Sequence, residues 1–118
     1  MNFSGVQHAL IAAAGCAAVV LFSASATAAG NAERGKAKSV TCQACHGPTG
    51  NSENAAFPKL AGQYRDYLVH ALTRYNTIGG RTNAIMQGMA ASLSKQDIED
   101  LAAWYASQKG LKTLEGQR

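Results

Sequence analysis

The side chains best suited to chemistry in this sequence are two thiols and an imidazole within five consecutive positions. Cys42 and Cys45 stand three residues apart in TCQACHG, and His46 follows the second cysteine directly. Thiolates and imidazoles act as metal ligands, redox groups and points of covalent attachment. The segment therefore predicts a functional site of one of three types: a redox dithiol, a zinc site or a covalent haem site.

Two of these site types lack their other parts. A thioredoxin-like pair opens a helix after a buried strand, and this chain has almost no strand-like alternation of β-branched residues. A zinc site needs a second pair of ligands, but beyond position 28 the only other histidine is His70 and there is no further thiol. C-x-x-C-H is the specific signal for haem attachment. We predict that Cys42 and Cys45 bind one haem c covalently and that His46 is the proximal iron ligand.

The first 28 residues are typical of an export signal. Residues 9–22 are apolar and uncharged, too few to span a bilayer comfortably, and small residues in SASATAAG follow them. Cleavage near Ala28 satisfies the A-x-A rule and removes Cys16. The residues that follow Cys16 are apolar, unlike the polar segment that follows the lipid-modified cysteine of a lipoprotein. We expect a bacterial periplasmic protein with a folded domain over 29–118 and no transmembrane segment in the mature chain.

The charges favour a protein partner over nucleic acid. The 11 Lys and Arg residues exceed the 7 Asp and Glu residues, but they are scattered and form no basic run. A mildly basic surface speeds encounter with an acidic partner.

The mature part of the chain has the pattern of an all-α fold. Asn31 is a plausible N-cap for a helix of about three turns that leads into the cysteine segment. Gly, Pro, Asn and Ser crowd residues 47–58, which predicts a loop, and apolar residues recur at helical spacing over 60–75.

The final helix carries the clearest signals. Ser94 and Asp97 form a capping pattern, apolar residues follow on one face, and Gly110 is positioned to end the helix. Residues 79–93 are predicted as a loop with a short helical turn. So few large apolar side chains form only a thin core, which a bound haem would complete.

The other face of the iron has four candidate occupants. Met86 and Met89 lie about 40 residues after His46, in the Gly-rich segment that precedes the final helix. His70 lies on the flank of an amphipathic helix, where we expect it to make no iron contact. From these residues alone, Met86, Met89, His70 or an open site remain possible.

Beyond single motifs, the chain resembles the small class I c-type cytochromes, in particular cytochrome c553 and the single-haem halves of cytochrome c4. The resemblance runs through AGNAERGKAKSVTCQACHG, GNS, FPKLAGQ and IMQGMAASLSKQDIEDLAAWYASQKG, nearly the whole predicted mature chain. It implies a small cytochrome c fold of three to five helices wrapped around one covalently bound haem.

The resemblance also implies a role for particular residues. Met86 would be the distal iron ligand, with Met89 as the fallback, and the carbonyl of Pro58 would accept a hydrogen bond from His46. Gly35 would allow the first helix to pack closely on Trp104 in the last helix.

The function expected on these grounds is electron carriage rather than catalysis. A haem held by His and Met suits single-electron exchange between redox proteins, a reductase and an oxidase that could carry acidic docking patches. One alternative is a cytochrome subunit of a periplasmic dehydrogenase or oxidase. Another is a haem protein that binds gas or peroxide at an open distal site, against which Met86 argues.

Overall fold

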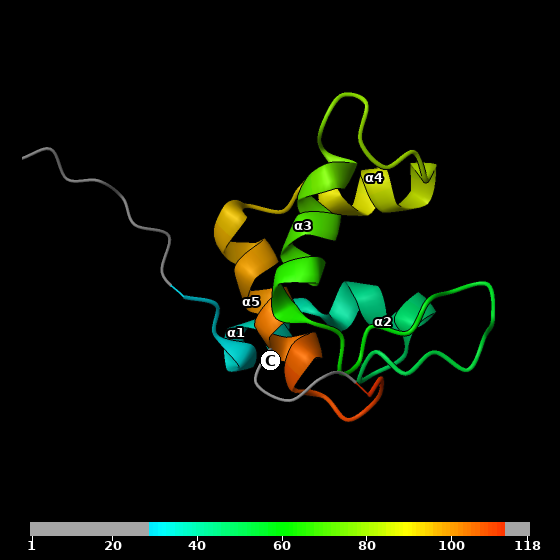
Figure 1. Ribbon diagram of the computed structural model, residues 1–118, viewed down its shortest axis with the longest axis vertical. Coiled ribbons are helices and arrows are strands. Elements are labelled where there is room, and N and C mark those ends of the chain that lie inside the picture. The colour runs from blue at the N-terminus through cyan, green and yellow to red at the C-terminus, as the bar shows by residue number, and fades with distance from the viewer. Residues whose placement is uncertain (1–28, 113–118) are drawn as a thin grey trace, which may run out of the picture.

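The computed structural model describes residues 29–112, which contain five helices and no strand. The predicted signal segment, residues 1–28, lies outside the described part. The all-α prediction and its range of three to five helices are confirmed (Figure 1). In chain order the helices are α1 (Ala32–Lys38), α2 (Val40–His46), α3 (Arg65–Tyr75), α4 (Ala84–Ala90) and α5 (Lys95–Ser107). None of them is long and apolar enough to cross a membrane.

The predicted first helix is two short helices that meet at Ser39. Asn31 caps α1 as expected, since its side chain accepts a hydrogen bond from the backbone N–H of Arg34 at 2.9 Å. Ser39 is fully buried, and its hydroxyl donates to the carbonyl of Lys36 at 2.8 Å. The cysteine segment therefore forms a helix of its own, α2, directly joined to α1.

Helices α1 and α5 cross with their backbones almost touching. A Cβ on Gly35 would stand 2.0 Å from the carbonyl oxygen of Asp100 and 2.8 Å from the Cβ of Trp104. The expected packing of Gly35 on Trp104 is confirmed, although the closest neighbour is the backbone of Asp100. The side chain of Asp100 is fully buried, and Arg34 binds it through two hydrogen bonds of 2.8 and 2.9 Å.

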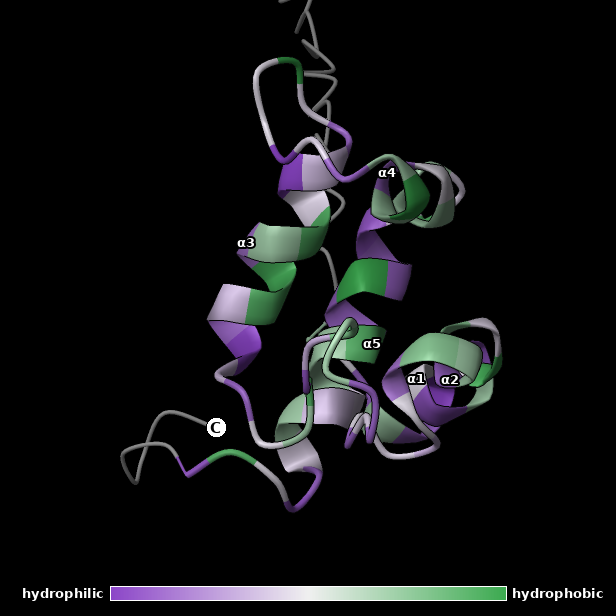
Figure 2. Cartoon of the chain, turned by 90° about the vertical axis from the view of Figure 1, so that its right-hand side faces the viewer, coloured by the Kyte–Doolittle hydropathy of each residue, from purple (hydrophilic) through white to green (hydrophobic). Residues whose placement is uncertain are grey.

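The core lies where α3 packs on α5. Leu68 of α3 meets Leu101, Ala102, Tyr105 and Ala106 of α5. In Figure 2 the hydrophobic side of α3 is turned toward α5 and its hydrophilic side points away. The predicted start of α3 near residue 60 is wrong, since the helix begins at Arg65. Gly62 explains why the helix starts later than predicted, because its φ of 74° lies outside the helical region.

Helix α4 replaces the segment predicted as loop with a helical turn. Asn83 caps it by accepting from the backbone N–H of Met86 at 3.0 Å. Both candidate methionines therefore lie on a helix of seven residues, which is longer than the short helical turn predicted for residues 79–93. Gly88 in the middle of this segment lowers its helix propensity, and so the helix signal in the sequence was weak.

The capping prediction for α5 is confirmed. The Ser94 hydroxyl accepts from the backbone N–H of Asp97, whose carboxylate in turn accepts from the backbone N–H of Ser94. Lys38 also forms an ion pair with Asp97 and ties α1 to the start of α5. The helix ends at Ser107, with Gln108 as its C-cap, so Gly110 lies beyond the helix end rather than at its stop.

Candidate functional site

Helix α2 presents both thiols within one helical turn. Cys42 and Cys45 are three residues apart, so they lie near one another on the helix surface; both are free and half-buried. Helix α2 is joined to α1, and its Cys42 side chain packs against the core that α3 and α5 form. Figures 1 and 2 show α2 and α4 on the same side of α3 and α5, one beyond the other. Cys42 therefore lies next to the α3–α5 core, and Cys45 follows it on the same helix.

The imidazole that ends α2 is buried and held in a defined orientation. His46 is only 5% exposed, and its Nδ1 lies 2.8 Å from the carbonyl oxygen of Pro58. A carbonyl oxygen can only accept, so Nδ1 carries the proton and donates. Nε2 then keeps its lone pair and can act as an acceptor. Phe57 packs edge-on at 6.4 Å between ring centroids. The ring is thus prepared to ligate a metal through Nε2.

The carbonyl of Pro58 is positioned by a loop that folds back on itself. Gly47 ends α2 with a φ of 80°, which turns the chain away from the helix. Further on, the carbonyl of Gly50 accepts from the backbone N–H groups of Leu60 and Ala61, at 2.7 and 3.1 Å. Gly50 itself lies against Tyr105, where an added Cβ would be 2.7 Å from the ring. The loop over 47–58, predicted from composition, therefore rests on α5.

A buried phenol lies beside the first thiol. The hydroxyl of Tyr105 finds no hydrogen-bond partner of good geometry among the described residues. Burial, with a contribution from the neighbouring Cys42, raises the pKa of Tyr105 above its usual range, so the phenol stays protonated at neutral pH. A buried polar group is normally paired. The unpaired hydroxyl is therefore available to a group bound at this thiol.

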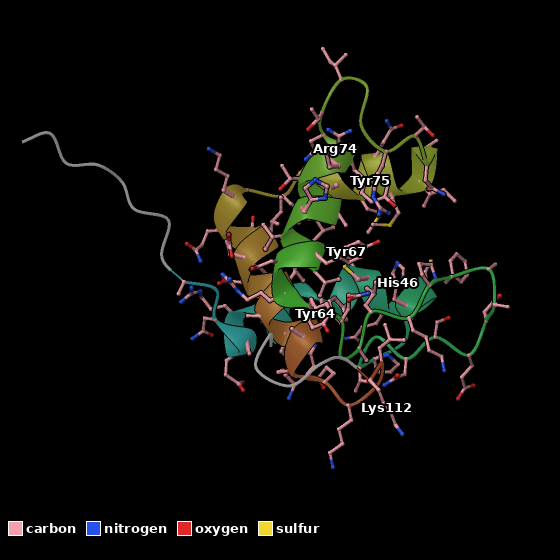
Figure 3. The ribbon with its side chains drawn as sticks, viewed as in Figure 1. His46, Tyr64, Tyr67, Arg74, Tyr75 and Lys112 are labelled. Atoms are coloured by element: carbon pink, nitrogen blue, oxygen red, sulfur yellow. The ribbon has the colours of Figure 1, made fainter. Side chains whose placement is uncertain are left out.

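The two methionines of α4 differ in exposure. Met86 is half-buried, whereas Met89 is 37% exposed. His70 is exposed on α3, in agreement with the flank position expected for it. Figure 3 labels His46 between α3 and the loop that follows α2.

Sequence reasoning missed a cluster that joins α3 to the start of α4. Arg81 donates to the hydroxyl of Tyr67 at 2.9 Å and lies within 3.4 Å of the hydroxyl of Tyr75. The tyrosines were grouped with the apolar residues of the helix, and Arg81 with the scattered surface charges. Only the eight-residue spacing of the tyrosines, followed by an arginine six residues on, could have indicated the cluster.

These residues fit a covalently attached haem. The two thiols have the spacing required for attachment and no disulfide joins them. The imidazole that follows them has its orientation fixed by a carbonyl, as metal-ligating histidines commonly have. The unpaired hydroxyl of Tyr105 lies beside one thiol, and the described core is small enough to need a further apolar body.

Comparison with known proteins agrees with this geometry. The cytochrome c family matches residues 32–109. Cytochrome c4 of Pseudomonas aeruginosa is 49% identical over 84 residues, which are 71% of this chain and 41% of that protein. A protein of Thiomonas intermedia named thiosulfate dehydrogenase electron acceptor is 42% identical over 73 residues, covering 61% of this chain and 33% of that one.

Solved structures give the same result. The crystal structure of reduced recombinant cytochrome c4 from Pseudomonas stutzeri superposes with a TM-score of 0.65 at 47% identity, over 70% of this chain and 48% of that one. The chain spans less than half the length of the cytochromes c4 that it matches. On the family match and these identities, the chain belongs to the cytochrome c family, whose cofactor is a covalently bound haem c with its iron.

Proposed function

We propose that this protein is a periplasmic carrier of single electrons, not a catalyst by itself. The observation that carries the proposal is the buried His46, whose Nδ1 is fixed on the carbonyl of Pro58 at 2.8 Å beside two free thiols. When bound, the haem supplies a one-electron couple between ferrous and ferric iron.

Each residue of the proposed site has one task. Cys42 and Cys45 hold the haem edge through thioether bonds, and His46 is the proximal ligand through Nε2. The Pro58 carbonyl orients the imidazole and raises its basicity as a ligand. Met86 would be the distal ligand, with Met89 as the fallback, as the resemblance to class I cytochromes implies.

The same arrangement accounts for exchange of electrons with protein partners. Ligation of the iron by both His46 and Met86 would leave no open position for a substrate, so electrons would pass through the haem edge that Cys42 and Cys45 would hold. Contact with a reductase or an oxidase is then brief and of small area. The excess of Lys and Arg over Asp and Glu favours partners with acidic docking surfaces.

An optical spectrum with a redox titration tests the proposal. Sulfur bound to ferric iron gives a weak absorption band near the far red, and a His/Met haem titrates as a single one-electron step. We expect Met86→Ala to abolish the band and Met89→Ala to retain it. The reverse pattern would move the ligand to Met89. A parent protein without the band would contradict methionine ligation and favour the open distal site that binds gas or peroxide.

A second candidate function is that of a cytochrome subunit of a periplasmic dehydrogenase or oxidase. The similarity to a protein named thiosulfate dehydrogenase electron acceptor favours it specifically. The haem site would be unchanged, and the difference lies in the partner. Purification of the protein from its own cells under mild conditions distinguishes the two: a catalytic subunit that stays bound in stoichiometric amount supports the complex, and a chain that elutes alone supports the free carrier.

A further inference from the structure

Helix α4 has little apolar packing to hold it in place. Of its seven residues only Ala90 is buried, while Ile85 is 66% exposed and Gly88 interrupts the middle. An isolated helix of this length is unstable in water, because nucleation costs more than so few hydrogen bonds return. Among the described helices α4 packs only against α3. The position of Met86 therefore depends on the contacts that join α4 to α3.

Most of the hydrogen bonds in this region converge on Arg81, three residues before the start of α4. The guanidinium donates to the Tyr67 hydroxyl at 2.9 Å, and its carbon lies 5.7 Å from the centre of the Tyr67 ring. It also approaches Tyr75, at 3.4 Å from the hydroxyl and 5.5 Å from the ring centre. A cation near two aromatic rings with a hydroxyl acceptor on each is held from several directions.

The backbone of Arg81 links the same two helices. Its N–H donates to the carbonyl of Arg74 in α3 at 3.0 Å, and its carbonyl accepts from the side chain of Gln87 in α4 at 3.1 Å. At the far end of α4, the Asn76 side chain donates to the carbonyl of Ala90 at 2.8 Å. Both ends of the helix are thus tied to α3, and among the described hydrogen bonds Arg81 makes those at the end nearer to Met86.

We infer that Arg81, held by Tyr67 and Tyr75, is a positioning residue that keeps α4 closed and so sets how readily the methionine leaves the iron. The inference rests on the proposed ligation by Met86. In Figure 3 the two tyrosines lie along α3 on the side toward α4. The name Arg81 clamp is used below for Arg81, Tyr67 and Tyr75.

Competition with added imidazole measures this opening. Imidazole binds the iron only when the methionine has left, so its apparent affinity is its intrinsic affinity multiplied by the fraction of open molecules. The far-red band reports the methionine-bound form directly. We expect Arg81→Gln to lower the imidazole concentration that removes half of the band by about three- to tenfold, the factor that corresponds to the net loss of one solvent-exposed hydrogen bond.

Matched variants separate the clamp from a general loss of charge or stability. Arg74→Gln removes a neighbouring positive charge. The Arg74 side chain makes one exposed contact, of 3.3 Å, with the Gly79 carbonyl, so we expect the imidazole midpoint of this variant to change by less than about twofold. Tyr67→Phe keeps the aromatic ring and should lower the imidazole midpoint more than Tyr75→Phe does, because Arg81 makes a short hydrogen bond to the Tyr67 hydroxyl and a long one to the Tyr75 hydroxyl. If Arg81→Gln does not fold, these two variants carry the test.

Helix content supplies the remaining readout. Opening of α4 alone leaves the α1, α3 and α5 core in place, so far-ultraviolet circular dichroism of Arg81→Gln in the absence of denaturant should show no loss of helix beyond that of α4. A normal far-red band with the same imidazole midpoint in Arg81→Gln and Arg74→Gln would overturn the inference and leave the proposed function intact. Equal losses of the band and of helix content would also overturn it. A parent protein without the band would overturn both.

Discussion

A single methyl group placed at Gly35 tests the packing that carries the whole fold. Gly35 lies in the middle of α1, where most helices would prefer Ala. The added Cβ would stand 2.0 Å from the carbonyl oxygen of Asp100 and 2.6 Å from its carbon. Because these are backbone atoms, no side chain can rotate away. Gly35→Ala therefore forces α1 and α5 apart by about 1 Å, the shortfall from the 3.0 Å that real Cβ atoms keep.

The cost follows from two opposing terms. Overpacking of this kind costs typically about 1 to 3 kcal/mol, and contact with rigid backbone belongs at the upper end. The higher helix propensity of Ala than of Gly offsets about 1 kcal/mol of this cost. We therefore expect Gly35→Ala to lower the free energy of unfolding by about 2 kcal/mol, a large share of the stability of so small a domain.

Guanidinium titration of the haem-loaded protein, followed by far-ultraviolet circular dichroism, measures the change. Gly88→Ala is the matched control, since a Cβ there meets nothing within 4 Å and carries only the propensity gain, about 0.5 to 1 kcal/mol. The two variants should thus shift the midpoint in opposite directions. Equal or greater stability of Gly35→Ala would refute the close approach of α1 and α5.

Three further predictions follow from the described contacts. Asp100→Ala should lower the free energy of unfolding by about 2 kcal/mol in the same titration, since it removes the acceptor of two partly buried hydrogen bonds, from the Asn31 backbone N–H and from the Arg34 guanidinium, while the exposed Asp66→Ala should change little. Hydrogen bonds from Lys38 and Ser94 lower the pKa of Asp97 to about 2. The contribution of Asp97 to the free energy of unfolding is therefore complete above about pH 4 and is lost as the pH falls toward 2, and Asp97→Asn should weaken the dependence of stability on pH in this range. Cys42→Ser combined with Cys45→Ser should leave little stable helix by circular dichroism, and a spectrum equal to that of the parent would contradict a haem-organised fold.

Local signals allowed much of the fold to be predicted. Asn31, and Ser94 with Asp97, satisfy backbone N–H groups within three residues, so the sequence alone contains both partners of each contact. The cysteine and histidine spacing is equally local. The hydrogen bond from His46 to Pro58 spans 12 residues and needed the family resemblance to be expected at all.

Contacts between distant residues escaped prediction. Asp100 looks like one more surface acid in QDIED, yet it is fully buried because Arg34, 66 positions earlier, binds it across the α1–α5 crossing. Nothing near either residue indicates the other. The full length of α4 was missed for a related reason, since the ties that stabilise it come from Arg81 and from Asn76 rather than from its own sequence.

The two sides of the proposed haem site are held by different kinds of contact. His46 is oriented by a backbone carbonyl in a loop that rests on the buried Tyr105, so it can move only if the core moves. Met86 lies on a helix with one buried residue, held by the exposed Arg81 clamp. Free energies of local opening are lowest where buried contacts are fewest. Opening should therefore begin at α4, on the side opposite the covalent bonds, and loss of the methionine would leave the haem attached through both thioethers and the histidine.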